Sequence, residues 1–588
     1  MTDGGSQGIF VVVAVVIFGI FVGISYLLYR DQMSPALAKL FCDAITMTSE
    51  RTGFASGLKG CDIQGDTSKD PIVVSYHKIR DADDAKGWSE VWVQIHELDN
   101  GNVEIIDSGN QDLFEDETYG NGLLGEISFP DQIAGKDVEI IGKSALQYAK
   151  FTNIMKLPSE LIILDSYSLQ QSRFSGNAIF PEKIEIIGTE ALRDSRFSGK
   201  LTDLPPSIIE IGEGAFQESV FEGEFNFPEG DKNFEGSSPE GSVSETIPNT
   251  IIGDKAFENS KFIGNITIPD YITEIGNDSF KNSNFSSITF PSNSSITMIG
   301  DSSFENSVIK GTVIIPSSVV SIGKDSFKNS QITKLTIPKD SEIETIGDGA
   351  FEYSMLGGIL WLPDSVKYIG DRAFYTAVFV NNNWILPTNL EYLGDYAFYN
   401  SNMIGRLTSN NRLKRIGSYS FYKSFSTQSK TTPSLYDGTW LEYSSVHDIV
   451  LGTKLEEIGE SAFYSAKFKN FDMRKAPNLK RIEKNAFYSS FNQSASNTTY
   501  GGTRIRKIPN KIYFNSKIEF IGESAFRNAR FNGEESIILP SSLKTVQSFA
   551  FYNSFIKLGS AYTFGIIYIH EHTNFSGNAS QATKLILK

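Results

Sequence analysis

The chain has 588 residues, which is too long for one compact core, so several domains or an elongated repeat array are expected. Its formal net charge is −17 and it contains no run rich in Lys and Arg. This argues against a nucleic-acid-binding protein, because neutralising phosphates requires clustered cations. With 43 Phe and 24 Tyr against 5 His and 2 Cys, the chain is rich in aromatic residues and poor in residues for metal or thiol chemistry.

An uncharged apolar segment lies near the start of the chain. Gly8–Tyr29 spans 22 residues, long enough to cross a hydrocarbon core of ~30 Å. A cleaved signal peptide is the alternative, but such peptides begin with basic residues and have a shorter apolar stretch, whereas residues 1–8 carry Asp3 and no base. We therefore expect a short tail at 1–8 and one transmembrane helix at 9–29.

The residues that follow this segment bear on its orientation. Arg30 and Lys39 would keep the bulk of the chain in the cytoplasm by the positive-inside rule, although a large domain can translocate despite a few nearby charges. Cys42 and Cys61 could form one disulfide in an oxidising compartment or remain two reduced thiols. The pair leans towards an exterior location, so we expect a single-pass protein of the cell membrane with an extracellular repeat domain.

Residues 30–122 have a mixed pattern. Met33–Glu50 spaces its apolar residues like an amphipathic helix. Three apolar segments follow at Pro71–Ile79, Trp88–Leu98 and Asn102–Gly109, and the turn sequence DNGN joins the last two. The pattern predicts a helix followed by a small antiparallel α+β module.

From residue 123 to about 560 the chain repeats every 23 or 24 residues. Each repeat has a marker position, usually a Gly preceded by Ile, and positions within a repeat are counted from it here. Leu or Phe always occupies position 4, and Ser or Ala always occupies position 7. The sixteen markers are Gly142, Asp165, Gly188, Gly212, Gly253, Gly276, Gly300, Gly323, Gly347, Gly370, Gly394, Gly417, Gly459, Glu483, Gly522 and Gln547.

A unit of this length cannot bury its own apolar side, so it must stack on copies of itself. We expect the position 4 side chains to form a stacked ladder, and the small position 7 residue to lie where the coil turns inward. The marker glycine should supply a tight bend or a positive φ. Segments such as Asn265–Pro269, Ser287–Pro291 and Lys334–Pro338 alternate apolar and polar residues, as half-buried strands do.

The full pattern, I-x-I-P-x-S-V-x-x-I-G-x-x-A-F-x-x-S, resembles the BspA-like class of leucine-rich repeat. Gly311–Ser330 and Leu360–Ala377 follow it closely. The class usually has Cys at the small position, where this chain has Ser or Ala. The resemblance implies a curved, mainly β solenoid of about sixteen coils and a place among surface-exposed, contact-making proteins. It implies no catalytic activity and no cofactor.

Three intervals between markers are longer than the rest, because residues rich in Gly, Ser, Thr and Asn are inserted near 229–247, 425–446 and 492–510. Insertions in solenoids often decorate a binding face, although each could equally be a surface loop without a task. Residues 561–588 are expected to form a C-terminal cap.

Exposed apolar residues are the candidate binding site. Alternation in the segment around Trp361 turns this side chain outward, and the same argument applies to Ile385 one coil later. Tyr368 and Tyr392 also face outward by alternation, so we expect the four to form an apolar patch that contacts a protein or glycan on another cell or matrix. A covering loop is the alternative.

Two other hypotheses remain. The sequence His570–His572 offers two imidazoles but no third ligand, so we expect no metal site.

The N-terminal helix and α+β module resemble the layout of type IV pilin-like proteins, which would make the chain a filament subunit and the helix a route to homo-oligomers. The chain lacks a basic leader before Gly8 and has Val13 where that family has Glu.

Overall fold

The structure is a computed structural model that describes most of the repeat region. The predicted membrane segment at 9–29, Cys42, Cys61 and most of the three insertions lie outside the described residues. Within the described part, no helix is long and apolar enough to cross a membrane. The described residues are 74–81, 90–109, 124–125, 129–151, 155–174, 178–198, 204–205, 207–224, 227, 250–354, 356, 360–377, 383–401, 403, 406–425, 448–468, 470–491, 499–500, 503–504, 512–529, 531–532, 537–556, 566–576 and 584–587.

The chain divides into two compact units. Unit 1 comprises Met1–Ser75, His96–Val103 and Asn233–Thr246, and unit 2 comprises the rest. In unit 1 the backbone N–H of Leu98 donates to the carbonyl of Asn102 at 2.7 Å, and Gly101 has a φ of +87°. This tight turn confirms the hairpin turn predicted at DNGN.

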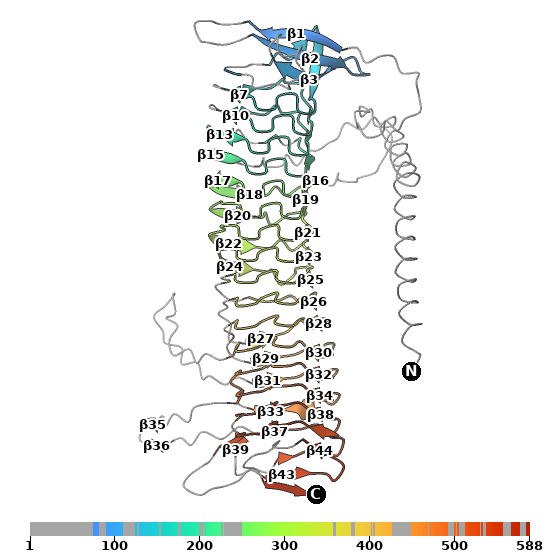
Figure 1. Ribbon diagram of the computed structural model, residues 1–588, viewed down its shortest axis with the longest axis vertical. Coiled ribbons are helices and arrows are strands. Elements are labelled where there is room, and N and C mark those ends of the chain that lie inside the picture. Colours follow the sequence, from blue (N-terminus) through green and yellow to red (C-terminus); the bar gives the residue numbers. More distant parts are fainter. Residues whose placement is uncertain are drawn as a thin grey trace, which may run out of the picture. The chain divides into compact units, whose positions relative to one another are not determined.

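Unit 2 is a stack of coils, and each coil contributes the strand that ends at its marker to one parallel column (Figure 1). The strands that follow the turn of each coil form a second column on the other side of the stack. The first column comprises two sheets. One begins with three strands that precede the coils, β1 (Val74–Arg80), β2 (Val91–Glu97) and β3 (Val103–Gly109), and continues with β6 (Lys136–Ile141), β9 (Ile163–Leu164), β12 (Ile186–Ile187), β14 (Glu210–Ile211), β16 (Thr250–Ile252), β19 (Ile272–Ile275), β21 (Met298–Ile299), β23 (Ser321–Ile322), β25 (Thr345–Ile346), β26 (Tyr368–Ile369) and β28 (Tyr392–Leu393), with β5 (Gln132–Ile133) antiparallel to β6. The other consists of β30 (Arg415–Ile416), β32 (Glu457–Ile458), β34 (Arg481–Ile482), β38 (Phe520–Ile521), β41 (Thr545–Val546) and β44 (Asn574–Phe575).

The remaining strands form short parallel sheets after the turn of each coil, and one antiparallel pair lies in the third insertion. The strands directly after the turn are β4 (Leu124–Gly125), β7 (Lys150–Phe151), β10 (Arg173–Phe174), β13 (Arg196–Phe197), β15 (Val220–Glu224), β17 (Lys261–Ile263), β39 (Phe531–Asn532) and β42 (Phe555–Ile556). The later ones are β8 (Met155–Lys156), β11 (Ala178–Ile179), β18 (Asn265–Thr267), β20 (Ser287–Thr289), β22 (Gly311–Ile314), β24 (Ile332–Thr336), β27 (Asn383–Ile385), β29 (Arg406–Thr408), β31 (Asp448–Val450), β33 (Asn470–Asp472), β37 (Ile512–Tyr513), β40 (Ile537–Ile538), β43 (Ile566–Ile569) and β45 (Lys584–Leu587), with the antiparallel pair β35 (Thr499–Tyr500) and β36 (Thr503–Arg504) and the 3₁₀ helix η3 (Met473–Lys475).

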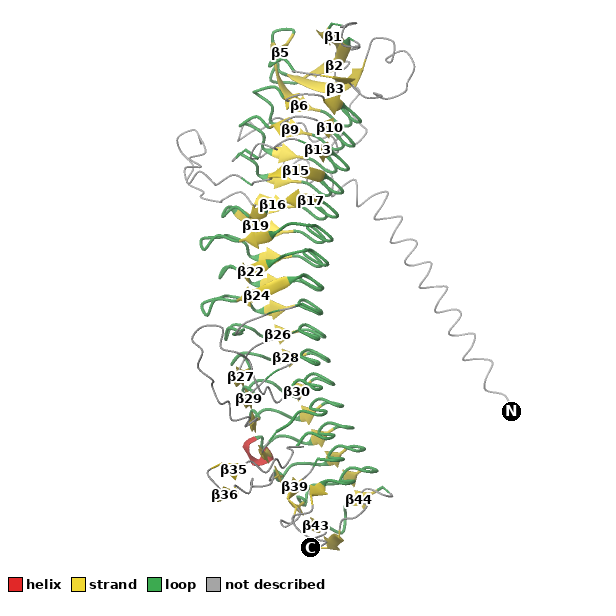
Figure 2. Ribbon diagram, turned by 90° about the vertical axis from the view of Figure 1, so that its left-hand side faces the viewer, coloured by secondary structure: helices red, strands yellow, loops and turns green. Residues whose placement is uncertain are grey.

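The two ends of the repeat region extend the same ladder. At the N-terminal end, the strands predicted for the α+β module appear as β1, β2 and β3, and β3 is the neighbour of β6 in the sheet. At the C-terminal end, β44 pairs with β41 and β45 pairs with β43, all in parallel. The expected cap at 561–588 therefore continues the coil pattern in its described residues (Figure 2).

The position 4 ladder is confirmed. Thirteen consecutive rings from Phe216 to Phe551 lie with neighbouring centroids 5.0–5.4 Å apart and planes within 16° of parallel. All are buried. Full burial of one such ring contributes ~1.5–3 kcal/mol, so the thirteen rings together form a continuous and strongly stabilising apolar row along the stack.

The small residue at position 7 has a second role that spacing did not reveal. Where it is Ser, its hydroxyl usually donates to the carbonyl of the position 4 residue in the preceding coil, for example Ser260 to Phe216 at 2.7 Å and Ser401 to Phe374 at 2.8 Å. A buried carbonyl left without a partner would be costly. Ser therefore satisfies the backbone as well as leaving space.

Two roles were expected for the marker glycines, a tight bend or a positive φ. The positive φ is wrong, because none of the described marker glycines has one. A Cβ on Gly300 would instead lie 2.6 Å from the carbonyl carbon of Gly276, so glycine is needed where the backbones of neighbouring coils approach closely. Left-handed conformations occur at positions 2 and 6, mostly in other residues, as in Asp278 (φ +52°) and Asn282 (φ +57°). Their N–H groups donate to the next coil, which offsets the strain.

Candidate functional site

The predicted outward row after the turn is exposed. Trp361 is 48% exposed and Ile385 56%, while Leu360 beside Trp361 is only 2% exposed. The equivalent residues Thr267 and Thr289 of earlier coils are also exposed but polar. The row therefore has apolar surface in two adjacent coils at Trp361 and Ile385, and exposed apolar residues elsewhere, for example Ile314 and Ile538.

Tyr368 and Tyr392 belong to strands β26 and β28 of the first column. Their rings stack with centroids 4.6 Å apart and planes within 6°. The Tyr368 hydroxyl donates to Asp348 at 3.4 Å and the Tyr392 hydroxyl to Asp371 at 3.3 Å. Burial, followed by the charge of Asp371, raises the pKa of Tyr392 to about 12.

The four predicted site residues thus lie in two rows. Ile385 is the last residue of β27, and Trp361 holds the equivalent place one coil earlier, outside any described strand, whereas the two tyrosines lie in the column of β26 and β28. The structure pairs the tyrosines with each other. Whether the two rows act as one patch stays a prediction.

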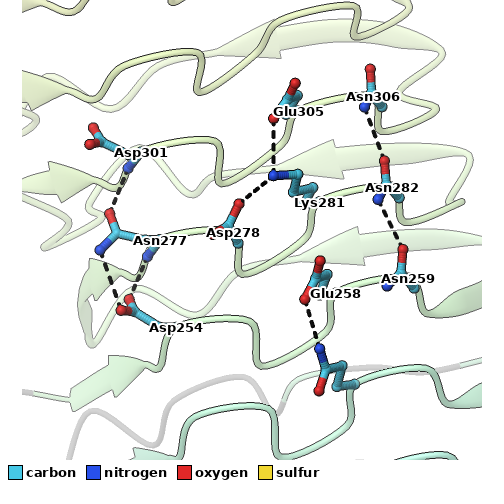
Figure 3. Close-up of polar contacts among 11 residues, drawn as sticks. Asp254, Glu258, Asn259, Asn277, Asp278, Lys281, Asn282, Asp301, Glu305 and Asn306 are labelled. Carbon is cyan, nitrogen blue, oxygen red and sulfur yellow. Dashed lines mark hydrogen bonds and ion pairs between the residues drawn. The ribbon is translucent and has the colours of Figure 1, made fainter.

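The turns of the coils that begin at Gly253, Gly276, Gly300 and Gly323 carry polar ladders, and Figure 3 shows those of the first three coils. Position 6 is Asn in all four, and the side-chain amides of the last three each donate to the Asn of the preceding coil at 2.9–3.0 Å. At position 5, Lys281 bridges Asp278 at 2.8 Å and Glu305 at 3.2 Å. These contacts tie one coil to the next and leave few side-chain groups unpaired for a ligand.

The coils from Gly370 onwards carry a different surface on the same turn. Position 5 is Tyr in five consecutive coils, and neighbouring rings stack with centroids 4.6–4.7 Å apart and planes within 17°. At position 2, Tyr396 and Tyr419 stack in a second, shorter ladder at 4.7 Å. Together these side chains are called the tyrosine face here, and they are Tyr375, Tyr396, Tyr399, Tyr419, Tyr422, Tyr464 and Tyr488.

Cations lie among these rings. The Arg372 guanidinium lies 5.3 Å from the ring centroid of Tyr375 and 5.8 Å from that of Tyr396. The Lys423 ammonium lies 5.4 Å from the Tyr422 ring. These contacts place positive charge beside the stacked rings.

Further along the stack, the Arg527 guanidinium takes position 5 and lies 5.8 Å from the Tyr488 ring and 4.9 Å from the Tyr552 ring. Partial burial raises the pKa of Tyr399 and Tyr422, so their hydroxyls stay neutral well above neutral pH. The face therefore presents neutral hydroxyls together with the cations Lys423 and Arg527. Arg372 also lies there, but it pairs with Glu352 of the preceding coil at 3.4 Å.

The tyrosine face was not recognised from the sequence, although the signal was present. The repeat register places Tyr375, Tyr399, Tyr422, Tyr464 and Tyr488 at one position, where earlier coils have Gln, Arg, Glu or Lys. Positions 4 and 7 could be predicted because they hold the same residue types in every coil, whereas position 5 changes along the chain. Stacking on neighbouring coils turns this shared position into a continuous surface.

The described residues contain no group of three or more His, Cys, Asp or Glu side chains that could hold a metal ion. His570 and His572 lie with ring centroids 5.9 Å apart, and His572 contacts the carbonyl of Ser541.

Comparison with known proteins gives a family. The model for the BspA type Leucine rich repeat region (6 copies) matches residues 114–244, 250–381, 369–494 and 505–579. No curated protein matches the chain.

Three solved structures match the chain at low identity. A leucine-rich repeat protein from Bacteroides ovatus is 16% identical, with 81% of this chain and 95% of that chain covered and a TM-score of 0.35. The pneumococcal vaccine antigen PcpA is 13% identical, with 85% and 97% covered and a TM-score of 0.31. A leucine rich cell surface protein from Faecalibacterium prausnitzii is 13% identical, with 82% and 92% covered and a TM-score of 0.29.

Proposed function

Because the chain belongs to the family of BspA-type leucine-rich repeat proteins, we propose that it is a membrane-anchored cell-surface protein that binds a protein or glycan partner without catalysis. The repeat domain would lie outside the cell and residues 9–29 would hold it in the membrane. The matches include no catalytic family.

The observation that carries the proposal is the exposure of Trp361 and Ile385. Both are about half exposed in a row where Thr267 and Thr289 hold the same place. Large exposed apolar side chains on a rigid scaffold mark contact sites more often than scattered polar ones. Packing between coils constrains only the buried positions of the repeat, so it does not explain large apolar side chains at these two exposed positions.

The test is binding of the full chain to arrays of immobilised matrix proteins and glycans. Trp361→Ala with Ile385→Ser should abolish binding to the partner that the unaltered chain selects, with unchanged thermal unfolding. The matched control is Ile314→Ser with Ile538→Ser, which removes two side chains of equal exposure (51% and 53%) from the same row elsewhere. Retained binding in the first variant would overturn the site.

Location needs its own test. Protease treatment of intact cells should degrade the repeat domain if it lies outside, and full protection would place it inside. A filament subunit remains the second candidate through residues 9–29, outside the described part. Electron microscopy of cell-surface material that showed filaments of this chain would favour it over a single-molecule anchor.

A further inference from the structure

We propose that the tyrosine face binds a linear polysaccharide that carries carboxylate or sulfate groups. The inference rests on the proposed function only in that the chain contacts a partner. It uses other side chains than Trp361 and Ile385, on the turn side of each coil.

The first argument is charge. Positions 2, 5 and 6 of the nine coils from Gly142 to Gly347 hold eight carboxylates and four cations. The same positions in the seven coils from Gly370 to Gln547 hold no carboxylate and three cations, Arg372, Lys423 and Arg527. In a chain of net charge −17, such a surface favours an anionic partner.

The second argument is the orientation of the rings. Because neighbouring rings at position 5 are stacked nearly parallel at 4.6–4.7 Å, their faces are already occupied and a partner meets ring edges and hydroxyls. The hydroxyls of four of these tyrosines have no hydrogen-bond partner among the described residues, namely Tyr375, Tyr399, Tyr422 and Tyr464. Burial is the main cause that raises the pKa of each. The face thus offers a line of neutral hydroxyls that can both donate and accept.

These two features together favour a polysaccharide over other anionic polymers. A protein partner would need apolar pockets for anchor residues, and stacked tyrosines present none. A nucleic acid would need free aromatic faces for its bases, which the stacking removes. A linear sugar polymer brings rows of hydroxyls with regularly placed anions, and it can run from coil to coil along the tyrosine face.

Carboxylates border the face at position 1, and most of them are already engaged. Asp395 pairs with Arg415 at 2.9 Å and Glu523 with Lys484 at 3.2 Å. Glu460 accepts the hydroxyl of Tyr419 at 3.0 Å. Their pairing limits repulsion of an anionic chain at positions 2, 5 and 6.

The experiment measures binding of the full chain to polygalacturonate and to heparin, with dextran as the neutral probe. We expect binding to at least one acidic probe, none to dextran, and weaker affinity at higher ionic strength. Arg372→Gln with Lys423→Gln and Arg527→Gln should weaken binding roughly tenfold, as expected for three partly exposed charge contacts. Tyr399→Phe with Tyr422→Phe keeps the rings and should weaken it a few-fold.

Two controls make the result decisive. Lys324→Gln with Lys334→Gln and Lys339→Gln removes three exposed cations from other rows and should leave binding unchanged. Trp361→Ala with Ile385→Ser should also leave it unchanged, so that loss there would implicate the other site. Failure to bind either acidic probe, equal binding to dextran, or equal loss in the lysine control would overturn the proposal, whatever the array shows for Trp361.

Discussion

The coils that begin between Gly253 and Gly323 and those that begin between Gly370 and Glu483 share one interior and differ in their exposed turns. Both groups stack Phe at position 4 with the same spacing, for example 5.0 Å for Phe304–Phe327 and 5.0 Å for Phe374–Phe398. On the turn, the first group has asparagine ladders and ion pairs, and the second has stacked tyrosines. Ladder formation is therefore a property of the stack, which aligns whatever residue a position holds.

The largest expected effect tests the shared interior. Phe304→Ala and Phe374→Ala each remove one ring from the ladder and should cost ~3–5 kcal/mol through lost burial and a cavity. Because the stability of a solenoid is a sum of local terms, the loss should appear as faster hydrogen exchange in the altered coil and its neighbours. A much smaller cost in one group than in the other would show that the two interiors are not equivalent.

A smaller effect separates two buried serine positions in both groups. Ser283→Ala removes the hydroxyl that donates to the carbonyl of Phe257 at 2.5 Å and should destabilise its coil by about 1 kcal/mol. At position 3, the buried hydroxyls of Ser303 and Ser420 have no hydrogen-bond partner in the described part of the chain. Ser303→Ala and Ser420→Ala should therefore be neutral or stabilising by up to ~1 kcal/mol in local hydrogen exchange. Destabilisation at position 3 would reveal a partner for that hydroxyl.

Alkaline pH should affect the stacked tyrosines of the first column. The pKa of Tyr392 is raised to about 12, against an ordinary value of 10.0, chiefly by burial and then by Asp371. The neutral ring is thus favoured in the folded chain, and this contribution is fully present below pH 10 and is lost as the pH rises through about 12. Tyr392→Phe should remove one late-titrating group from the absorbance of tyrosinate, while that of Tyr271, whose pKa is also raised by burial, should remain. An unchanged titration curve in the variant would contradict the assignment.

The smallest effect concerns the charged residues on the turns of the first group. Lys281→Met breaks two partly buried ion pairs and should change local stability by about 0.5 kcal/mol or less, with a smaller difference at high salt. Tyr422→Phe in the second group should be insensitive to salt. Equal salt dependence of both coils in hydrogen exchange would remove the electrostatic distinction between them.

The positive φ expected at the markers shows where reasoning from spacing failed. Glycine at Gly300 was correctly identified as necessary, but its cause is the backbone of Gly276 in the neighbouring coil, 2.6 Å from where a Cβ would lie. One repeat unit contains no information about that distance. The left-handed residues escaped notice for the same reason, since Asp278 and Asn282 adopt this conformation when hydrogen bonds to the next coil stabilise it.

The sequence by itself determined the period, the position 4 ladder, the buried small residues and the outward side of Trp361 and Ile385, because burial at a fixed spacing leaves a periodic pattern in the residues. Only the tertiary structure decided which exposed residues meet. It joined Tyr375 to Tyr399 across an interval of 24 residues, paired Tyr368 with Tyr392, and placed these two tyrosines in a different row from Trp361 and Ile385. Contacts between coils depend on how one unit lies against the next, which no single repeat specifies.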